Sequence, residues 1–174
     1  MSNFAPNMEE ILNKVSASGL VTFNLEDLID NAPQKSIDIK EQLYMGLMLK
    51  EKEFREYIKN NDWAEYKDCN VAIFCSTEAI VPTWAYMLIA NKLTTIAKNF
   101  VFGNSDSLNE YLFYKALNNT NFDIYKDQRV VIKGCSDKPV PTSAYVFLTE
   151  KLTPIVKSLM FGEPCSTVPI YKRS

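Results

Sequence analysis

The sequence contains no histidine among its 174 residues. This absence excludes Ser–His–Asp and Cys–His nucleophile systems, histidine-ligated metals and the most common proton shuttle near neutral pH. Only five glycines are present, and none forms a GxGxxG or GxxxxGK[ST] motif, so the common phosphate-binding loops are missing. The chemistry that remains is that of cysteine, carboxylates, lysine, tyrosine and helix N-termini.

The chain also lacks a long basic run and a long apolar run. Its 19 basic and 21 acidic residues leave a net charge of −2, so we expect no nucleic-acid partner. The longest apolar-rich stretch, 79–90, is too short to span a bilayer. The N-terminus is acidic and polar, unlike a signal peptide. We therefore expect a soluble, cytoplasmic protein without a membrane partner.

The composition is typical of a folded globular protein, with 47% apolar and 12% aromatic residues. A chain of this length fits one domain. No linker rich in proline, glycine or serine divides it, and 30–36 is the only loop-like break. We therefore expect a single domain over residues 1–174.

The most informative feature is an internal repeat. The chain has VPTWAY at 81–86 and VPTSAY at 140–145, and a shift of 59 residues aligns 66–103 with 125–162 without a gap. Seventeen of these 38 aligned positions are identical. Such agreement indicates an internal duplication.

Each copy has the pattern strand, helix, strand. Short apolar runs bounded by turn residues predict the strands, and a proline marks the first turn of each repeated helix. The expected strands are 70–74, 100–103, 129–133 and 159–162. The expected helices are 82–97, 141–156 and, from a capping box formed by Ser107 and Glu110, 107–118.

This alternation predicts an α/β fold with a mostly parallel, doubly wound sheet. A dyad between the two copies gives the repeat the strand order 2-1-3-4. Ligands of such sheets bind beyond the carboxyl ends of the strands, at the topological switch, which lies between the first strands of the two copies. Ahead of the repeat, 19–24 and 36–39 predict a hairpin at one edge, and 40–60 predicts a long helix.

Three of the four cysteines are expected at the carboxyl edge of this sheet. Cys75 and Cys135 follow the first strands of the two copies and Cys165 follows the last strand, whereas Cys69 precedes its strand. Three converging thiolates could hold an iron–sulfur cluster, or zinc with a carboxylate as fourth ligand, or include one reactive thiolate. Buried cysteines are also ordinary core residues, and no CxxC pair marks a metal site.

The starts of the two repeated helices form a second candidate site. Their free backbone N–H groups would face the switch and bind an anion. Neighbouring hydroxyls would assist, namely Ser76, Thr83, Ser136 and Thr142. The repeated VPTxAY motif also has a purely structural interpretation, as a helix start whose Ala-Tyr pair faces the sheet.

Three segments resemble a known bacterial family. CSTEAIVPTWAYM, KGCSDKPVPTSAYV and GEPCSTVPIYKR are similar to the domain of unknown function 2480, and the likeness runs from about Gly19 to Arg173. The family offers no assigned activity or catalytic residue to transfer. Its members are often encoded beside genes for iron–sulfur cluster assembly, so the resemblance implies an accessory role there.

These observations lead to one main hypothesis and two alternatives. The main hypothesis is a cytoplasmic protein in which Cys75, Cys135 and Cys165 bind a metal or an iron–sulfur cluster and serve iron–sulfur assembly proteins. The first alternative is an enzyme or binding module for a small anionic ligand at the carboxyl-end crevice. The second is a protein-interaction subunit in which the cysteines only pack.

Overall fold

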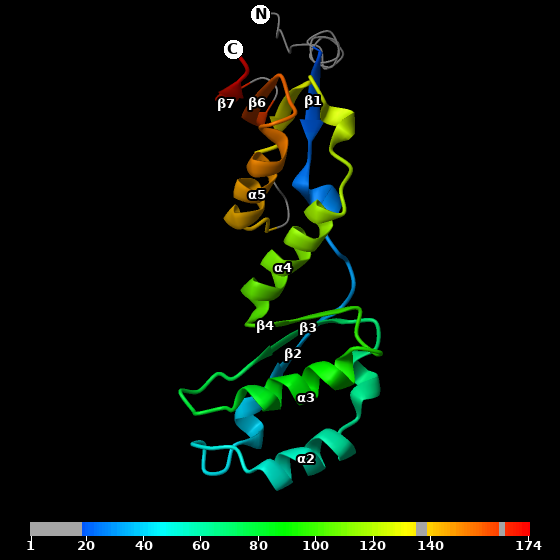
Figure 1. The fold of residues 1–174 in the computed structure, drawn as a ribbon, viewed down its shortest axis with the longest axis vertical. Coiled ribbons are helices and arrows are strands. Elements are labelled where there is room, and N and C mark those ends of the chain that lie inside the picture. The colour runs from blue at the N-terminus through cyan, green and yellow to red at the C-terminus, as the bar shows by residue number, and fades with distance from the viewer. Residues whose placement is uncertain (1–18, 135–138, 164–165) are drawn as a thin grey trace, which may run out of the picture. The chain divides into compact units, whose positions relative to one another are not determined.

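The chain forms two separate β-sheets, each belonging to its own compact unit (Figure 1). The computed structural model describes residues 19–134, 139–163 and 166–174. Unit 1 consists of the described residues up to Ile29 together with those from Tyr114 onward. Unit 2 runs from Asp30 to Phe113, so along the chain it interrupts unit 1.

Unit 2 contains a three-stranded parallel sheet in the order β2-β3-β4. Its elements, with η for a short 3-10 helix, are β2 (Gln34–Asp38), η2 (Ile39–Gln42), α2 (Glu51–Asn60), η3 (Trp63–Tyr66), β3 (Asn70–Phe74), α3 (Thr83–Leu93), β4 (Asn99–Phe102) and the first part of α4 (Ser105–Asn118). Successive residues of β3 face opposite sides of the sheet. Val71 and Ile73 pack in one core cluster with residues of α2 and α3. Ala72 packs with Leu108 and Leu112 of α4 in another, which explains why β3 is a continuous apolar run.

Unit 1 contains a four-stranded sheet in the order β1-β5-β6-β7. The first three strands are parallel, and β7 is antiparallel to β6. Its elements are β1 (Leu20–Phe23), η1 (Leu25–Leu28), the end of α4, η4 (Asp123–Tyr125), β5 (Arg129–Ile132), α5 (Thr142–Leu152), β6 (Ser158–Glu163) and β7 (Ser166–Lys172). The buried ring of Phe23 lies 6.2 Å from that of Phe122 and 5.4 Å from that of Tyr125, between centroids. No helix in the described part of the chain is long and apolar enough to cross a membrane.

The two units contain matching elements at the spacing of the sequence repeat. The order β3-α3-β4 in unit 2 corresponds to β5-α5-β6 in unit 1. Asp68 and Asp127, which are 59 residues apart, both have a φ of 58°. Each helix buries three residues at intervals of four, which are Ala85, Ile89 and Leu93 in α3 and Ala144, Leu148 and Leu152 in α5. These matches favour the duplication that the sequence predicts.

The correspondence extends beyond the predicted repeat to the N-terminal strands. β2 pairs with β3 so that Ile37 lies opposite Ile73, and β1 pairs with β5 so that Phe23 lies opposite Ile132. A 3-10 helix follows each of these strands. The residue before each 3-10 helix, Asn24 or Asp38, accepts a hydrogen bond from the backbone two residues on. Each unit therefore holds a strand that the sequence repeat does not include.

The predicted α/β class and the mostly parallel pairing are confirmed. The strand pairs β3–β4 and β5–β6 are parallel, as expected. The single sheet in the order 2-1-3-4 is wrong, because β3 and β5 lie in separate sheets. The place beside β3 is taken by β2, and the place beside β5 by β1. The predicted N-terminal hairpin is wrong for the same reason, since β1 and β2 pair with different strands.

The predicted helix over 40–60 is only partly present, because α2 begins at Glu51. A tight turn precedes it, with a φ of 52° at Met45 and 71° at Gly46. The N–H of Tyr44 donates to the carbonyl of Met48 at 2.7 Å and closes this turn. Two consecutive residues in the left-handed region cannot continue a right-handed helix, which is why the helix starts later than the apolar pattern predicts.

The other helices are confirmed with shifted ends. The predicted helices 82–97 and 141–156 end earlier, at Leu93 and Leu152. The predicted capping box at Ser107 is wrong, because α4 begins at Ser105. Asn104 performs the capping instead, since its side-chain oxygen accepts a hydrogen bond from the N–H of Ser107 at 3.1 Å.

Replacing Asp68 by valine should lower the free energy of unfolding of unit 2 by about 1–2 kcal/mol. A β-branched side chain is strongly disfavoured at a φ of 58°, and the hydrogen bond from the Asp68 N–H to the Ile96 carbonyl (3.0 Å) holds the backbone there. Urea denaturation followed by tryptophan fluorescence measures this change, since Trp63 and Trp84 both lie in unit 2.

Lys67→Val is the matched control for this substitution. Lys67 is exposed and has a φ of −59°, so valine there should change the free energy of unfolding by less than about 0.5 kcal/mol. Equal losses in the two variants would contradict a special backbone conformation at Asp68.

Candidate functional site

The carboxyl ends of β2 and β3 in unit 2 bring several polar groups together. Asp38, the last residue of β2, lies opposite Phe74 at the end of β3. The N–H of Ser76 donates to Asp38 Oδ1 at 3.0 Å. The thiol of Cys75 lies 3.3 Å from the hydroxyl of Thr77 and shares a hydrogen bond with it. This corner of the sheet is a small polar cluster built around one carboxylate.

The carboxylate of Asp38 is ionised at neutral pH. Partial burial alone would raise the pKa of Asp38, but hydrogen bonds from Ser76 and from the N–H of Lys40, with the nearby Lys40 ammonium, together lower that pKa. Burial raises the pKa of the Tyr86 phenol, and the neighbouring Cys75 and Asp38 raise it further. A fixed carboxylate at this position opposes the binding of an anion.

The described strands do not form the single-sheet switch at which the anion-binding hydroxyls were expected. That switch was expected between β3 and β5, which lie in separate sheets. Thr83 and Thr142 are the first residues of α3 and α5. The N–H of Ser76 is already bonded to Asp38. Ser136 lies outside the described residues.

The structure describes two of the four cysteines. Cys75 is half-buried after β3, whereas Cys69 is buried before β3, with its sulfur 3.4 Å from the carbonyl oxygen of Lys67. Cys135 and Cys165 lie outside the described residues. The expectation that one sheet edge gathers Cys75 with these two is wrong in its premise, because their strands are split between two sheets. Within residues 19–134, 139–163 and 166–174, no three His, Cys, Asp or Glu side chains form a group that could hold a metal ion.

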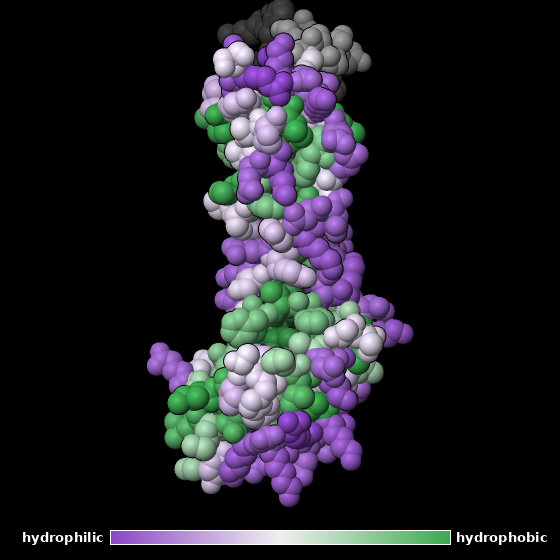
Figure 2. Space-filling view, viewed as in Figure 1, coloured by the Kyte–Doolittle hydropathy of each residue, from purple (hydrophilic) through white to green (hydrophobic). Residues whose placement is uncertain are grey.

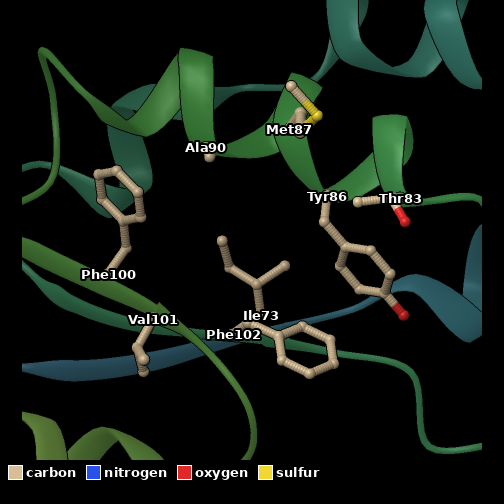
Figure 3. Close-up of a pocket in the computed structure, with 8 residues that line it drawn as sticks. All are labelled: Ile73, Thr83, Tyr86, Met87, Ala90, Phe100, Val101 and Phe102. Atoms are coloured by element: carbon tan, nitrogen blue, oxygen red, sulfur yellow. The ribbon is translucent and has the colours of Figure 1, made fainter.

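An apolar pocket of about 480 Å³ lies in unit 2 between α3 and β4 (Figure 3). In this view Ile73 stands in the middle of the group, between Phe100 on one side and Tyr86 on the other. The rings of Tyr86 and Phe102 meet edge to face, with centroids 5.0 Å apart and planes at 86°. Phe102 is 69% exposed and Met87 is 65% exposed, so much of this apolar lining faces solvent.

Unit 1 has a matching but smaller pocket of about 260 Å³ between α5 and β6. It includes the residues 59 positions after five that line the pocket of unit 2, namely Ile132, Tyr145, Val146, Thr149 and Phe161. The rings of Tyr145 and Phe161 also meet edge to face, at 5.7 Å and 84°. The sixth lining residue, Ile170, comes from β7, a strand without a counterpart in unit 2.

Neither the pockets nor β7 is predicted by the sequence patterns described above. In the sequence, Tyr86 and Tyr145 have the pattern of helix residues that face the sheet, and Phe102 and Phe161 lie near the ends of predicted strands. Tyr86 and Phe102 recur as Tyr145 and Phe161 at the spacing of the repeat. This recurrence is the signal that could have indicated a pair of contacting rings in each unit.

A second exposed apolar surface of unit 2 is the loop patch, which we define by its residues: Tyr44, Met45, Leu47, Met48 and Ile80. Their exposed fractions run from 44% at Tyr44 to 85% at Ile80. A backbone bridge joins Met48 to Ile80, so the patch spans two loops that are far apart in the sequence. Figure 2 shows hydrophobic residues gathered on the surface of unit 2, in the lower part of the view.

Replacing Asp38 by asparagine should lower the free energy of unfolding at pH 7 by about 1 kcal/mol, since a charge-assisted hydrogen bond is lost. The pKa of Asp38 is lower in the folded protein than its ordinary value of 3.8. The ionised carboxylate therefore stabilises the fold above that value, and this contribution is lost as the pH falls below about 4. Urea denaturation at pH 7, 5, 4 and 3 should show the gap between wild type and variant closing.

Glu78→Gln is the control for this pH dependence, because Glu78 is an exposed carboxylate of the same unit. A gap between wild type and Asp38→Asn that stays constant down to pH 3 would show that the ionised carboxylate does not stabilise the fold.

Comparisons with known proteins identify the family of the chain without naming an activity. No curated protein and no solved structure matches it. The model of a family of proteins of unknown function, DUF2480, matches residues 9–173. This match covers nearly the whole sequence, and the chain therefore belongs to the DUF2480 family.

Proposed function

We propose that this protein is a protein-interaction module that holds apolar side chains of a partner in the pocket of unit 2. The observation that carries the proposal is the exposure of Phe102 and Met87, at 69% and 65%, beside a pocket whose lining is mostly apolar. Covering such side chains removes apolar surface from water and favours association. The volume of about 480 Å³ lies in the range of ordinary ligand sites.

The loop patch supports the same proposal for the same unit. Its five exposed side chains belong to a structured turn and a bridged loop, and they include two methionines, which adapt well to varied partner surfaces. Exposed apolar patches of this kind mark interaction sites in soluble proteins. The proposal corresponds to the protein-interaction alternative of the sequence analysis, in which the cysteines are packing residues.

The pocket should bind linear alcohols with an affinity that rises about fourfold for each methylene added from butanol to heptanol. The reason is that each methylene moved out of water contributes about 0.8 kcal/mol. The measurement is the shift of the Met87 methyl signal in a proton–carbon spectrum of protein labelled at the methionine methyl groups. Met45 and Met48, 77% and 55% exposed in the loop patch, report non-specific solvent effects.

A pocket-filling variant tests where the alcohol binds. Ala90→Phe should abolish the saturable shift of Met87, because Ala90 lines the pocket. Thr149→Phe, at the equivalent position of unit 1, is the matched control and should leave the shift unchanged. If Met87 and Met45 shift alike and without saturation, the pocket does not bind apolar groups and the proposal fails.

A metal or iron–sulfur site is the second candidate function. The observation that favours it is that Cys135 and Cys165 follow β5 and β6, which are neighbouring parallel strands of one sheet. Thiolates at these positions would bind zinc or a cluster, and the role we propose for such a site is assistance to iron–sulfur cluster assembly in the cytoplasm. Cys75 follows β3, which belongs to the other sheet, so we do not include Cys75 in this proposed site.

Protein purified without oxygen should contain zinc or iron if this second candidate is right, and Cys135→Ser should lose it. Metal analysis and a visible absorption spectrum give the measurement. Cys69→Ser is the control, because Cys69 is buried with its thiol directed at backbone carbonyls. Equal metal content in the two variants, or none in the wild type, would remove the cysteine site.

A further inference from the structure

The outer edge of β4 in unit 2 is open and apolar. β3 is its only neighbouring strand among the described residues. Asn99 and Gly103 direct their N–H groups to β3, at the carbonyls of Cys69 and Ile73. Because successive residues of a strand alternate, Phe100 and Phe102 direct their backbone groups to the open side. These groups form a template for one more strand.

Unit 1 shows what occupies the same edge in the matching sheet. β6, the counterpart of β4, is paired on its outer side with the antiparallel strand β7. Phe161 lies opposite Val168 in this pair. Phe161 is 36% exposed, whereas its counterpart Phe102 in unit 2 is 69% exposed. β7 also supplies Ile170 to the pocket, which is smaller than the pocket of unit 2.

The edge of β4 carries none of the features that usually prevent strand addition. Its sequence is NFVF, without proline, charge or an irregular register. The outer edge of β7, by contrast, has Pro169, Lys172 and a register shift opposite Leu159 and Met160. β2, at the other edge of unit 2, reads QKSID and is polar. Proteins protect exposed edges with such residues, so their absence from β4 points to an edge that is covered when the protein acts.

We propose that β4 accepts an extended segment of a partner polypeptide as an additional antiparallel strand, with a branched aliphatic side chain entering the pocket between α3 and β4. This inference rests on the proposed function. It adds how the partner binds, by strand addition, and which class of partner binds, an extended polypeptide segment. Main-chain hydrogen bonds to Phe100 and Phe102 provide affinity, and the pocket selects the side chain. The pairing of β7 with β6 in unit 1 is the template for the main-chain hydrogen bonds and for the side chain that enters the pocket.

A partner segment matches this template better than a second copy of β4. The strand that covers β6 has seven residues, of which Ile170 reaches the pocket, whereas β4 offers four residues. The β7 strand of a second copy is already paired with its own β6. The expected partner sequence therefore resembles β7, with an aliphatic residue at the position of Ile170 and an extended, polar-flanked backbone.

The test is fluorescence polarisation of a labelled peptide with the sequence of residues 166–174, titrated with the full-length protein. Binding should be saturable, and Ala90→Phe should weaken it at least tenfold, whereas Thr149→Phe in unit 1 should leave it unchanged. Met87→Glu, at a side chain that is 65% exposed, provides a second variant of the same pocket with little risk to folding. Replacing Ile170 by aspartate in the peptide should also weaken binding at least tenfold.

Backbone methylation separates strand pairing from insertion of a side chain alone. Val168 and Tyr171 lie opposite Phe161 and Leu159, the residues of β6 whose backbone groups face β7. A peptide N-methylated at Val168 and Tyr171 should therefore bind at least tenfold more weakly. Methylation at Thr167, which alternates with Val168 along the strand so that its N–H points away from β6, is the matched control and should have little effect.

The outcomes distinguish this inference from the proposed function. If all methylated peptides bind equally, or if the peptide does not bind while the alcohols do, strand addition is overturned and the apolar pocket stands. If light scattering shows a dimer that Phe102→Asp dissociates, the edge belongs to a second copy and the inference is overturned. If the alcohols do not bind, the proposed function itself fails.

Discussion

The architecture depends on which strand completes the hydrogen bonding of the first strand in each repeat copy. β3 is flanked by β2 and β4, and β5 by β1 and β6. Once an N-terminal strand occupies the free side of β3 and another that of β5, the two cannot pair with each other. Two sheets follow from this constraint, and with them two pockets of the same design. The polar corner at Asp38 and Ser76 likewise exists because β2 lies directly beside β3.

The two pockets show how one added strand changes a shared design. In unit 1 the edge residue Phe161 faces a strand, and Ile170 fills part of the pocket. In unit 2 the equivalent Phe102 faces solvent. The ring pairs Tyr86–Phe102 and Tyr145–Phe161 keep nearly the same edge-to-face geometry in both units. The units differ at two helix positions that line the pockets, Met87 against Val146 and Ala90 against Thr149, and at the strand edge. The open edge is the reason why we assign the binding role to unit 2.

Much of the fold could be predicted from the sequence because the signals are local. Apolar runs located β3, β4, β5 and β6, and the repeated proline located the starts of α3 and α5. The pairing of β1 and β2 could not be predicted, because strands of four or five residues carry little information about their partners, and adjacency in the chain suggested a hairpin. The helix expected from residue 40 failed because no propensity argument foresees a left-handed conformation at Met45.

The candidate site could be predicted less well, for a related reason. Grouping Cys75 with Cys135 and Cys165 depended on the prediction that β3 and β5 are neighbours in one sheet. Because these strands lie in separate sheets, the reason for that grouping no longer holds. The pockets depend on Tyr86 and Phe102, which the repeat makes visible but which resemble ordinary core residues in the sequence. The exposure of Phe102 is a property of tertiary structure, since no strand in the described part of the chain pairs with the outer edge of β4.

The interruption of unit 1 by unit 2 has a consequence for how the chain emerges from the ribosome. Leu20 in β1 pairs with Arg129 in β5, across more than one hundred residues of chain, whereas every strand pair of unit 2 lies within 30–113. At synthesis rates of about 5–20 residues per second, β1 must wait on the order of 5–20 s for its partner strand. Unit 2 can complete its sheet during that interval. Translation therefore favours folding of unit 2 before unit 1, and β1 stays unpaired until β5 has been synthesised.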